Sequence, residues 1–153
     1  MKSRWIWIGI GLLVAVLALV LWPGDQRLPK PVRQAIRQRF PSAQLIEAKE
    51  RTRDGKAVYS VSLVQARRRA DMTVTGDGQV TRVARDIAFD DVPRAAADAL
   101  AAKYPNAIYR SIEEISKVKT GGETVITYEA LLLNAKKREV EVQVTLDGKI
   151  KSR

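Results

Sequence analysis

Hydrophobic residues recur with a helical period in two segments, and each segment ends in an aromatic residue followed by Pro. Spacings of three and four residues between apolar positions are typical of an amphipathic helix with one face on a core. The two stripes are Val32, Ala35, Ile36 and Phe40 before Pro41, and Val92, Ala96, Ala99, Leu100 and Tyr104 before Pro105. In the second helix we expect Asp90 or Asp91 to be the N-cap, with Pro93 in the first turn.

After each helix, apolar and polar residues alternate with the period of a strand that has one buried face. The apolar positions are Tyr59, Val61 and Leu63 in the first segment and Val140, Val142, Val144 and Leu146 in the second. Asp-Gly pairs at 54–55, 77–78 and 147–148 predict hairpin turns, because both residue types tolerate a positive φ. The pattern therefore predicts an α+β fold in which each helix is followed by three or four antiparallel strands.

The two helix-and-strand segments also match each other in sequence. Phe40-Pro41-Ser42-Ala43 matches Tyr104-Pro105-Asn106-Ala107 at an offset of 64, and 74–80 matches 144–150 at an offset of 70. Two copies of one unit, 27–86 and 87–153, are the economical explanation. Each copy would pack one helix on a sheet of three or four strands. One helix on so small a sheet is marginal alone, so we expect a shared core or a continuous sheet, and the pattern leaves open which.

The chain begins with an apolar run that is long enough to cross a membrane. Of the 18 residues from Trp5 to Trp22, 16 are apolar and the other two are Gly. A helix of that length spans roughly 27 Å, close to the thickness of a hydrocarbon core. Trp residues stand at both ends, and Pro23-Gly24 ends the run, as expected of interfacial aromatics and a helix exit. Residues 1–24 therefore predict a transmembrane helix that serves as a membrane anchor.

A cleaved signal peptide is the alternative, because Lys2 and Arg4 would suit its basic start. The one suitable cleavage site, Val16-Leu17-Ala18, would leave the apolar stretch 19–22 at the new terminus, which favours an uncleaved anchor. Basic residues flank both ends of the run. The positive-inside rule alone therefore leaves the topology open.

The sequence has no Cys and no His among its 153 residues. This excludes Ser-His-Asp and Cys-His catalysis, disulfides and conventional zinc or haem-His sites, so we expect no cofactor and no metal. A hydrolase that used carboxylates alone would need Glu139 or Glu141 in a cleft with an altered pKa. A solvated pair is the simpler interpretation of these residues, and the chain is not expected to be an enzyme.

Charge divides the two predicted units. Residues 27–85 hold 14 Lys and Arg against 5 Asp and Glu, a net charge of +9, whereas residues 86–153 hold 11 of each. The basic first unit predicts contact with anionic lipid or an acidic partner, unless it is only a solvated surface. Nucleic acid is not an expected partner, because the part after the apolar run has few aromatic residues for base stacking.

Two basic triplets and two tyrosines occupy matched positions in the repeat and are the candidate binding residues. The triplets could bind carboxylate or phosphate groups, or they could protect sheet edges against aggregation. The tyrosines could line a sheet face that grips a peptide, or they could be core residues. The residues are Arg67, Arg68 and Arg69 with Lys136, Lys137 and Arg138, and Tyr59 with Tyr128.

Several of these short motifs resemble the PepSY-like domain family, which is related in fold to tandem-repeat β-lactamase-inhibitor proteins. The motifs are Leu28-Pro29, Phe40-Pro41-Ser42-Ala43, Asp54-Gly55-Lys56, Val58-Tyr59 and Asp77-Gly78-Gln79-Val80, with Val92-Pro93, Tyr104-Pro105-Asn106-Ala107, Tyr128 and Asp147-Gly148-Lys149-Ile150 in the second unit. The resemblance implies an exported, non-catalytic bacterial envelope protein. It also decides the topology that the charge rule leaves open, because it implies that the part after the apolar run is periplasmic. Together with the predicted anchor, this gives a single-pass inner-membrane protein.

These observations predict a membrane-anchored periplasmic module that binds a protein or peptide partner, such as an accessory or regulatory subunit of an envelope complex. The alternative is a module that binds anionic lipid or another polyanion through its basic first unit.

Overall fold

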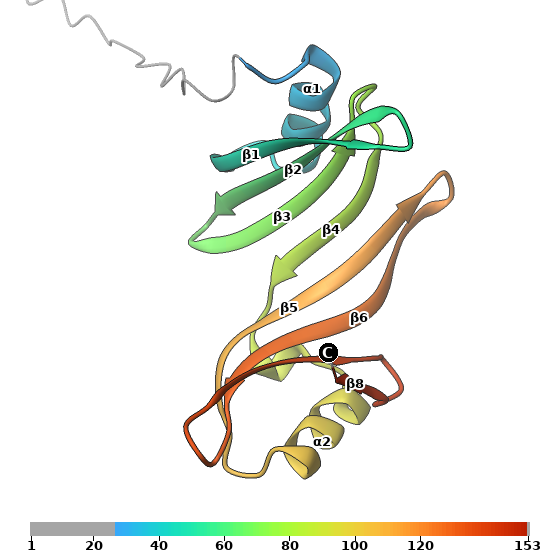
Figure 1. Ribbon diagram of the computed structural model, residues 1–153. Helices are drawn as coiled ribbons and strands as arrows, with labels where there is room; N and C mark the ends of the chain where they lie inside the picture. The colour runs from blue at the N-terminus through green and yellow to red at the C-terminus, as the bar shows by residue number, and fades with distance from the viewer. Residues whose placement is uncertain (1–26, 153) are drawn as a thin grey trace, which may run out of the picture.

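The residues that the computed structural model describes, 27–152, form one antiparallel sheet of eight strands in sequence order, with two α-helices (Figure 1). The first half comprises α1 (Lys30–Arg39), β1 (Gln44–Arg53), β2 (Lys56–Gln65), β3 (Arg68–Thr75) and β4 (Val80–Asp86). The second half comprises a short 3-10 helix η2 (Phe89–Asp91), α2 (Arg94–Lys103), β5 (Ile108–Lys119), β6 (Gly122–Leu133), β7 (Glu139–Val144) and β8 (Ile150–Ser152).

The predicted fold class, two units that each pack one helix on a small sheet of their own, is wrong. Strands β4 and β5 pair along the register from Arg82↔Lys117 to Asp86↔Glu113, so the eight strands are continuous. The alternation in the sequence shows which face a residue occupies, but not which strand lies beside it. Without this pairing, both β4 and β5 would expose a row of unpaired backbone groups.

The predicted anchor, Trp5–Trp22, lies outside the described residues. Between residues 27 and 152, no helix has both the length and the apolar character needed to cross a membrane.

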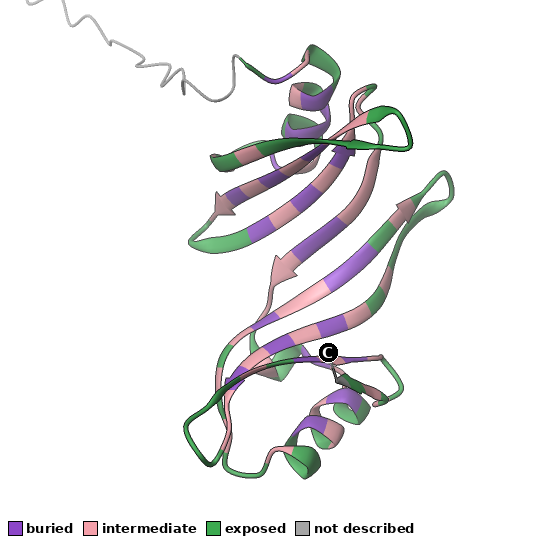
Figure 2. Ribbon diagram, viewed as in Figure 1, coloured by how far each residue is buried: buried purple, intermediate pink, exposed green. Residues whose placement is uncertain are grey.

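Each helix buries its apolar stripe on one half of the sheet, as the sequence predicts (Figure 2). Helix α1 packs through Val32, Ala35 and Ile36 into a cluster with β2, β3 and β4, and α2 packs through Ala96 and Leu100 into a second cluster with β5, β6 and β7. The expected cap of α2 is wrong. Pro93 occupies the N-cap position, while Asp90 and Asp91 lie earlier, in η2.

Both helices cover the same face of the sheet. Val83 of the first cluster pairs directly with Ser116 of β5, and directly paired residues point to the same face. Ile112 belongs to the second cluster and lies four residues from Ser116 on the same strand, so it also points to that face. No helix among residues 27–152 covers the opposite face, which we call the open face.

A small ionic cluster links the two halves on the helix-covered side. Glu123 of β6 accepts hydrogen bonds from Arg85 of β4 and from Arg39 at the end of α1. The Arg85 guanidinium also lies over the Phe40 ring, 5.8 Å from its centroid. Hydrogen bonding to Arg85, reinforced by the charges of both arginines, lowers the pKa of Glu123 to about 2. The carboxylate therefore stays ionised far below its ordinary range.

Two of the predicted Asp-Gly turns pack closely against the helices. Gly78 has a φ of +91°, and a Cβ built on it would lie 2.8 Å from the Pro31 carbonyl oxygen. Gly148 has a φ of +83°, and its Cβ would lie 2.6 Å from the Ala95 carbonyl oxygen. Each turn therefore touches the first turn of a helix, and only Gly allows both the conformation and the approach.

We expect Gly148→Ala to destabilise the protein more than Gly55→Ala. Gly55 also has a positive φ, +73°, but a Cβ there would meet nothing within 4 Å. Gly55→Ala should therefore lose about 1–2 kcal/mol from the backbone conformation alone. Gly148→Ala should lose about 1–3 kcal/mol more, because the Ala95 backbone must move. Urea unfolding of the full-length protein in a non-ionic detergent measures both, and equal losses would show that this contact does not matter.

Candidate functional site

Three carboxylates lie next to each other on the open face, in one row that runs across the strands. Asp86 of β4 pairs directly with Glu113 of β5, which pairs directly with Glu129 of β6. We call Asp86, Glu113 and Glu129 the carboxylate row. Side chains of directly paired residues lie about 5 Å apart at Cβ, and like charges at that distance repel.

Arg69 partly balances the carboxylate row from its β3 side. Its backbone N–H donates to Asp86 Oδ2 at 3.2 Å, and its Nε donates to Asp71 Oδ2 at 3.2 Å. Burial nevertheless raises the pKa of Glu113, as do the nearby carboxylates of Asp71, Asp86 and Glu129, while Arg69 opposes the rise. The row therefore holds a carboxylate in surroundings that disfavour its ionised form.

A cationic depression of about 380 Å³ lies beside the row on the same face. Arg82 and Lys117 pair directly across β4 and β5, and Lys151 reaches the depression from β8. None of these three cations forms an ion pair within the part of the chain that the structure describes. We call this depression the basic pocket, and its lining is Arg82, Ile115, Lys117, Ile126, Thr127, Gln143 and Lys151.

A second depression of about 350 Å³ adjoins the basic pocket and shares Arg82 with it. Its polar lining combines side chains from the first half with two carboxylates of the second: Ser60, Ser62, Arg69, Asp71, Thr73, Arg82, Glu113 and Glu129. The open face therefore presents an acidic and a cationic area side by side, and both depend on the β4–β5 pairing. Charged groups of a partner are the ligands that such a surface can bind.

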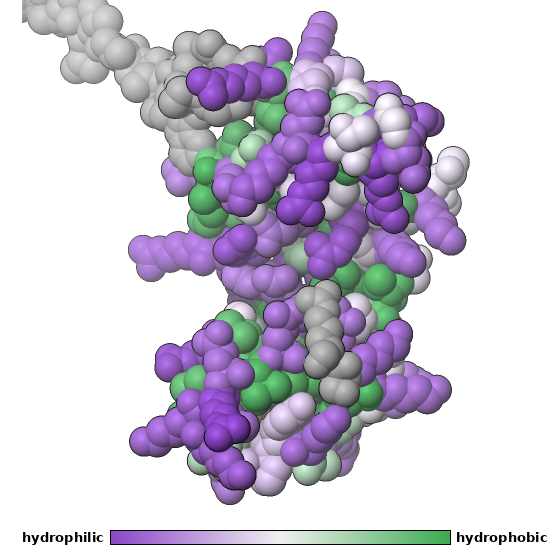
Figure 3. Space-filling view, in the orientation of Figure 1, coloured by the Kyte–Doolittle hydropathy of each residue, from purple (hydrophilic) through white to green (hydrophobic). Residues whose placement is uncertain are grey.

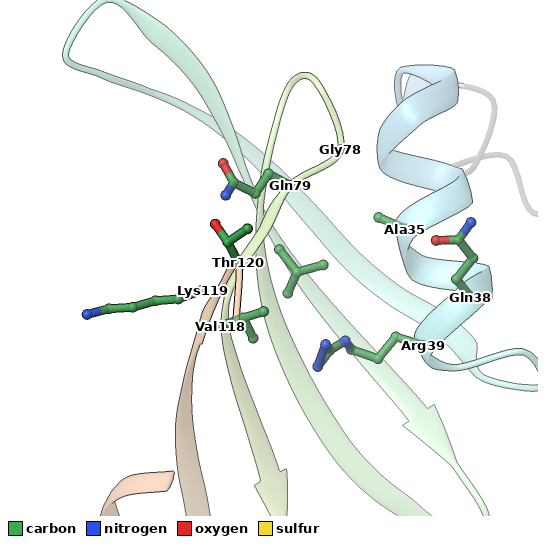
Figure 4. Close-up of a pocket in the computed structure, with 9 residues that line it drawn as sticks. Ala35, Gln38, Arg39, Gly78, Gln79, Val118, Lys119 and Thr120 are labelled. Atoms are coloured by element: carbon green, nitrogen blue, oxygen red, sulfur yellow. The ribbon is translucent and has the colours of Figure 1, made fainter. Parts of the chain in front are cut away.

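The largest of the three depressions, about 430 Å³, lies on the helix-covered side between α1, the β3–β4 turn and the end of β5 (Figure 4). Its charged residues are Arg39 and Lys119. Arg39 is already bound to Glu123, and Lys119 extends away from α1 (Figure 4). Only Lys119 of this crevice is a cation without an ion pair among residues 27–152, whereas the basic pocket has three such cations.

Metal binding finds no support in residues 27–152, which contain no group of three or more acidic side chains placed to hold an ion. Glu139 and Glu141, the candidate pair for a carboxylate hydrolase, lie exposed on β7. Because both side chains are exposed, the pair lies on a solvated surface and not in a cleft. Their cross-strand partners, Leu133 and Leu131, add no further carboxylate.

The predicted binding residues separate into three groups. Tyr59 and Tyr128 are buried with exposed fractions of 7% and 4%, on the face that the helices cover, and burial raises the pKa of both hydroxyls. Arg67 and Arg68 lie exposed at the β2–β3 turn, whereas Arg69 reaches the open face.

The second triplet stays in a turn. Lys136, Lys137 and Arg138 lie exposed between β6 and β7. Asn134 shapes this turn, because its side-chain Oδ1 accepts the backbone N–H groups of Lys136 at 2.9 Å and Arg138 at 3.1 Å.

The other charged residues of the open face are not among the binding residues predicted from the sequence. They are Asp86, Glu113, Glu129, Arg82, Lys117 and Lys151. The sequence shows only that these residues occupy polar positions of strands in which polar and apolar residues alternate. What brings them together is the β4–β5 register, which the alternation does not contain.

No protein-family model and no curated protein sequence matches the chain, but solved structures share its fold. A protein described as periplasmic from Bacteroides eggerthii aligns with a TM-score of 0.61 at 14% identity, covering 80% of this chain and 85% of its own. A DUF2874 family protein from Bacteroides uniformis aligns at 0.61 and 18% identity, covering 82% and 88%. A BLIP-like protein from Bacteroides fragilis aligns at 0.55 and 10% identity, covering 81% and 83%. The chain therefore has a BLIP-like fold.

We expect Glu113→Gln to stabilise the protein at pH 7. Because the folded-state pKa of Glu113 is raised above its ordinary 4.5, the ionised side chain weakens the fold. The unfolding free energy of the wild type should fall, relative to the variant, as the pH rises from about 4.5 through that pKa. The gain at pH 7 should reach about 0.5–1 kcal/mol in urea unfolding. Glu139→Gln, on exposed β7, is the control and should change little; a loss of stability in Glu113→Gln would contradict the repulsion.

Proposed function

We propose that the protein is a non-enzymatic interaction module of the periplasm that binds a protein or peptide partner through its open face. One observation carries the proposal. Within residues 27–152, the continuous sheet places both helices on one face and leaves the other without a helix, with two adjoining depressions and three cations that form no ion pair with these residues.

The character of the surface supports a polar and separable interface. Hydrophilic side chains cover most of the surface in view in Figure 3, with small hydrophobic patches between them. The exposed large hydrophobic residues of the described part are scattered along the chain: Ile46, Ile108, Ile126 and Leu146. Interfaces between proteins that also exist separately are about as polar as ordinary surface, whereas permanent interfaces are more apolar.

The cellular location rests on two supports. Similar folds occur in proteins described as periplasmic, and the apolar run Trp5–Trp22 suits a single-pass anchor in the inner membrane. In this proposal the sheet faces the periplasm, the internal sequence repeat reflects a PepSY-like origin, and the protein is an accessory or regulatory subunit of an envelope complex. The non-enzymatic part is supported by a sequence without His or Cys.

Position-specific photo-crosslinking in living cells tests the proposal. Benzoylphenylalanine placed at Thr73 or Gln143 of the open face should give an adduct with one protein, which mass spectrometry identifies. The control positions Gln34 on α1 and Ala102 on α2 are exposed and should give none, because both helices lie on the opposite face. Adducts at all four positions, or only at the controls, would contradict partner binding through this face.

Exposed cations in the first half support a second candidate function, contact with anionic lipid. Lys30 on α1 and Arg51 and Arg53 on β1 are exposed, in a half whose net charge is +9 over residues 27–85. Basic residues near an anionic membrane contribute roughly 1 kcal/mol each.

If this function holds, α1 and β1 should exchange amide hydrogens more slowly in phosphatidylglycerol nanodiscs than in phosphatidylcholine nanodiscs. High salt should remove the difference, because it screens exposed charges. Lys30→Glu combined with Arg51→Glu should remove it too, whereas Lys103→Glu on α2 should not. Equal exchange in both lipids would exclude this contact.

A further inference from the structure

The basic pocket gathers three cations that form no ion pair within the described part of the chain. Arg82 and Lys117 are directly paired across the β4–β5 junction, and Lys151 comes from the far edge strand, β8. Directly paired like charges destabilise a sheet, and none of the three has an ion-pair partner among residues 27–152. An anion from outside these residues would remove the repulsion.

The lining of the pocket favours a carboxylate ligand. Its volume is about 380 Å³, and Ile115, only 3% exposed, belongs to its lining. A guanidinium such as that of Arg82 can bind a carboxylate with two parallel hydrogen bonds, and the apolar lining strengthens such a contact by excluding water. Carboxylate groups of Asp or Glu side chains meet these requirements.

The neighbouring carboxylate row determines what can carry that anion. Glu113 lies four residues before Lys117 on β5, and Asp86 lies four residues after Arg82 on β4, which places the row roughly 14 Å along the strands from these two cations. A ligand with continuous negative charge, such as a bilayer of anionic headgroups, would meet repulsion from Asp86 and Glu113. A protein segment that carries an acidic and a basic side chain at that spacing would satisfy both areas.

We propose that the basic pocket receives an Asp or Glu side chain of the partner protein, while a Lys or Arg of the same segment lies over the carboxylate row. This inference rests on the proposed function and names the epitope that the open face recognises. In an extended segment, residues i and i+4 have the required separation. The two charges also fix the orientation of the bound segment, because reversing it would pair like charges.

Nuclear magnetic resonance titration of the ¹⁵N-labelled full-length protein, in a non-ionic detergent, tests the epitope. The probes are three blocked synthetic peptides: Ser-Glu-Ser-Ser-Ser-Lys-Ser, the same peptide with Gln in place of Glu, and the same peptide with Gln in place of Lys. The first should shift the amides of Arg82, Lys117, Gln143 and Lys151. Each of the others should bind roughly tenfold more weakly, because each loses one charge-assisted contact.

Variants of the protein locate the effect. Lys117→Gln should weaken the first peptide roughly tenfold, whereas Arg110→Gln, an exposed cation on the same strand, should leave its affinity unchanged. Equal binding of all three peptides, or equal effects of the two variants, would overturn the inference. Phosphatidylglycerol nanodiscs that produce the pocket shifts where the peptides do not would also overturn it, in favour of lipid.

The cross-linking experiment separates this inference from the proposed function. If open-face adducts persist at full yield in Lys117→Gln, the partner-binding function stands and the carboxylate site is wrong. If no open-face adduct forms in cells but the first peptide binds the pocket selectively, the site stands as a carboxylate receptor and the proposed function is wrong.

Discussion

The backbone pairing of β4 with β5 is the interaction on which the rest of the structure depends. It joins two groups of four strands into one sheet, and its register decides which side chains of the two halves meet. Because the pairing keeps both helices on one side, no helix of residues 27–152 covers the other side. The same register places Arg82 beside Lys117 and Asp86 beside Glu113, so the charge pattern of the open face also follows from it.

The two sides of the sheet shift the pKa of a Glu side chain in opposite directions. On the helix-covered side, Glu123 lies between two arginines, and its pKa falls to about 2. On the open face, Glu113 lies among carboxylates and is partly buried, and its pKa rises. The first arrangement ties the halves together, while the second weakens the fold locally. A ligand of opposite charge that binds this surface removes the repulsion between its like charges, and the free energy gained in this way favours binding.

Much of the local structure could be predicted from the sequence, because the period of apolar residues reports burial directly. Both helical stripes, the alternating strands and the turn at Asp54-Gly55 follow from it. The single sheet and the site could not be predicted, since neither Arg82 nor Lys117 carries information about the other. Of the predicted binding residues, Arg69 belongs to the open face, whereas Tyr59 occupies the apolar positions of its strand and packs in the core.

Strand order that follows chain order has a consequence for synthesis. Six of the eight strands can pair with an earlier strand after a short turn, but β5 follows β4 only after η2 and α2. Until residue 108 and beyond have been made, β4 is an edge strand with unpaired backbone groups, which invites pairing with another copy of the chain. Arg82 and Arg85 lie on that edge. Charged side chains on an exposed edge strand disfavour pairing with a second chain. In the completed sheet, Arg85 binds Glu123 and Arg82 lines the basic pocket.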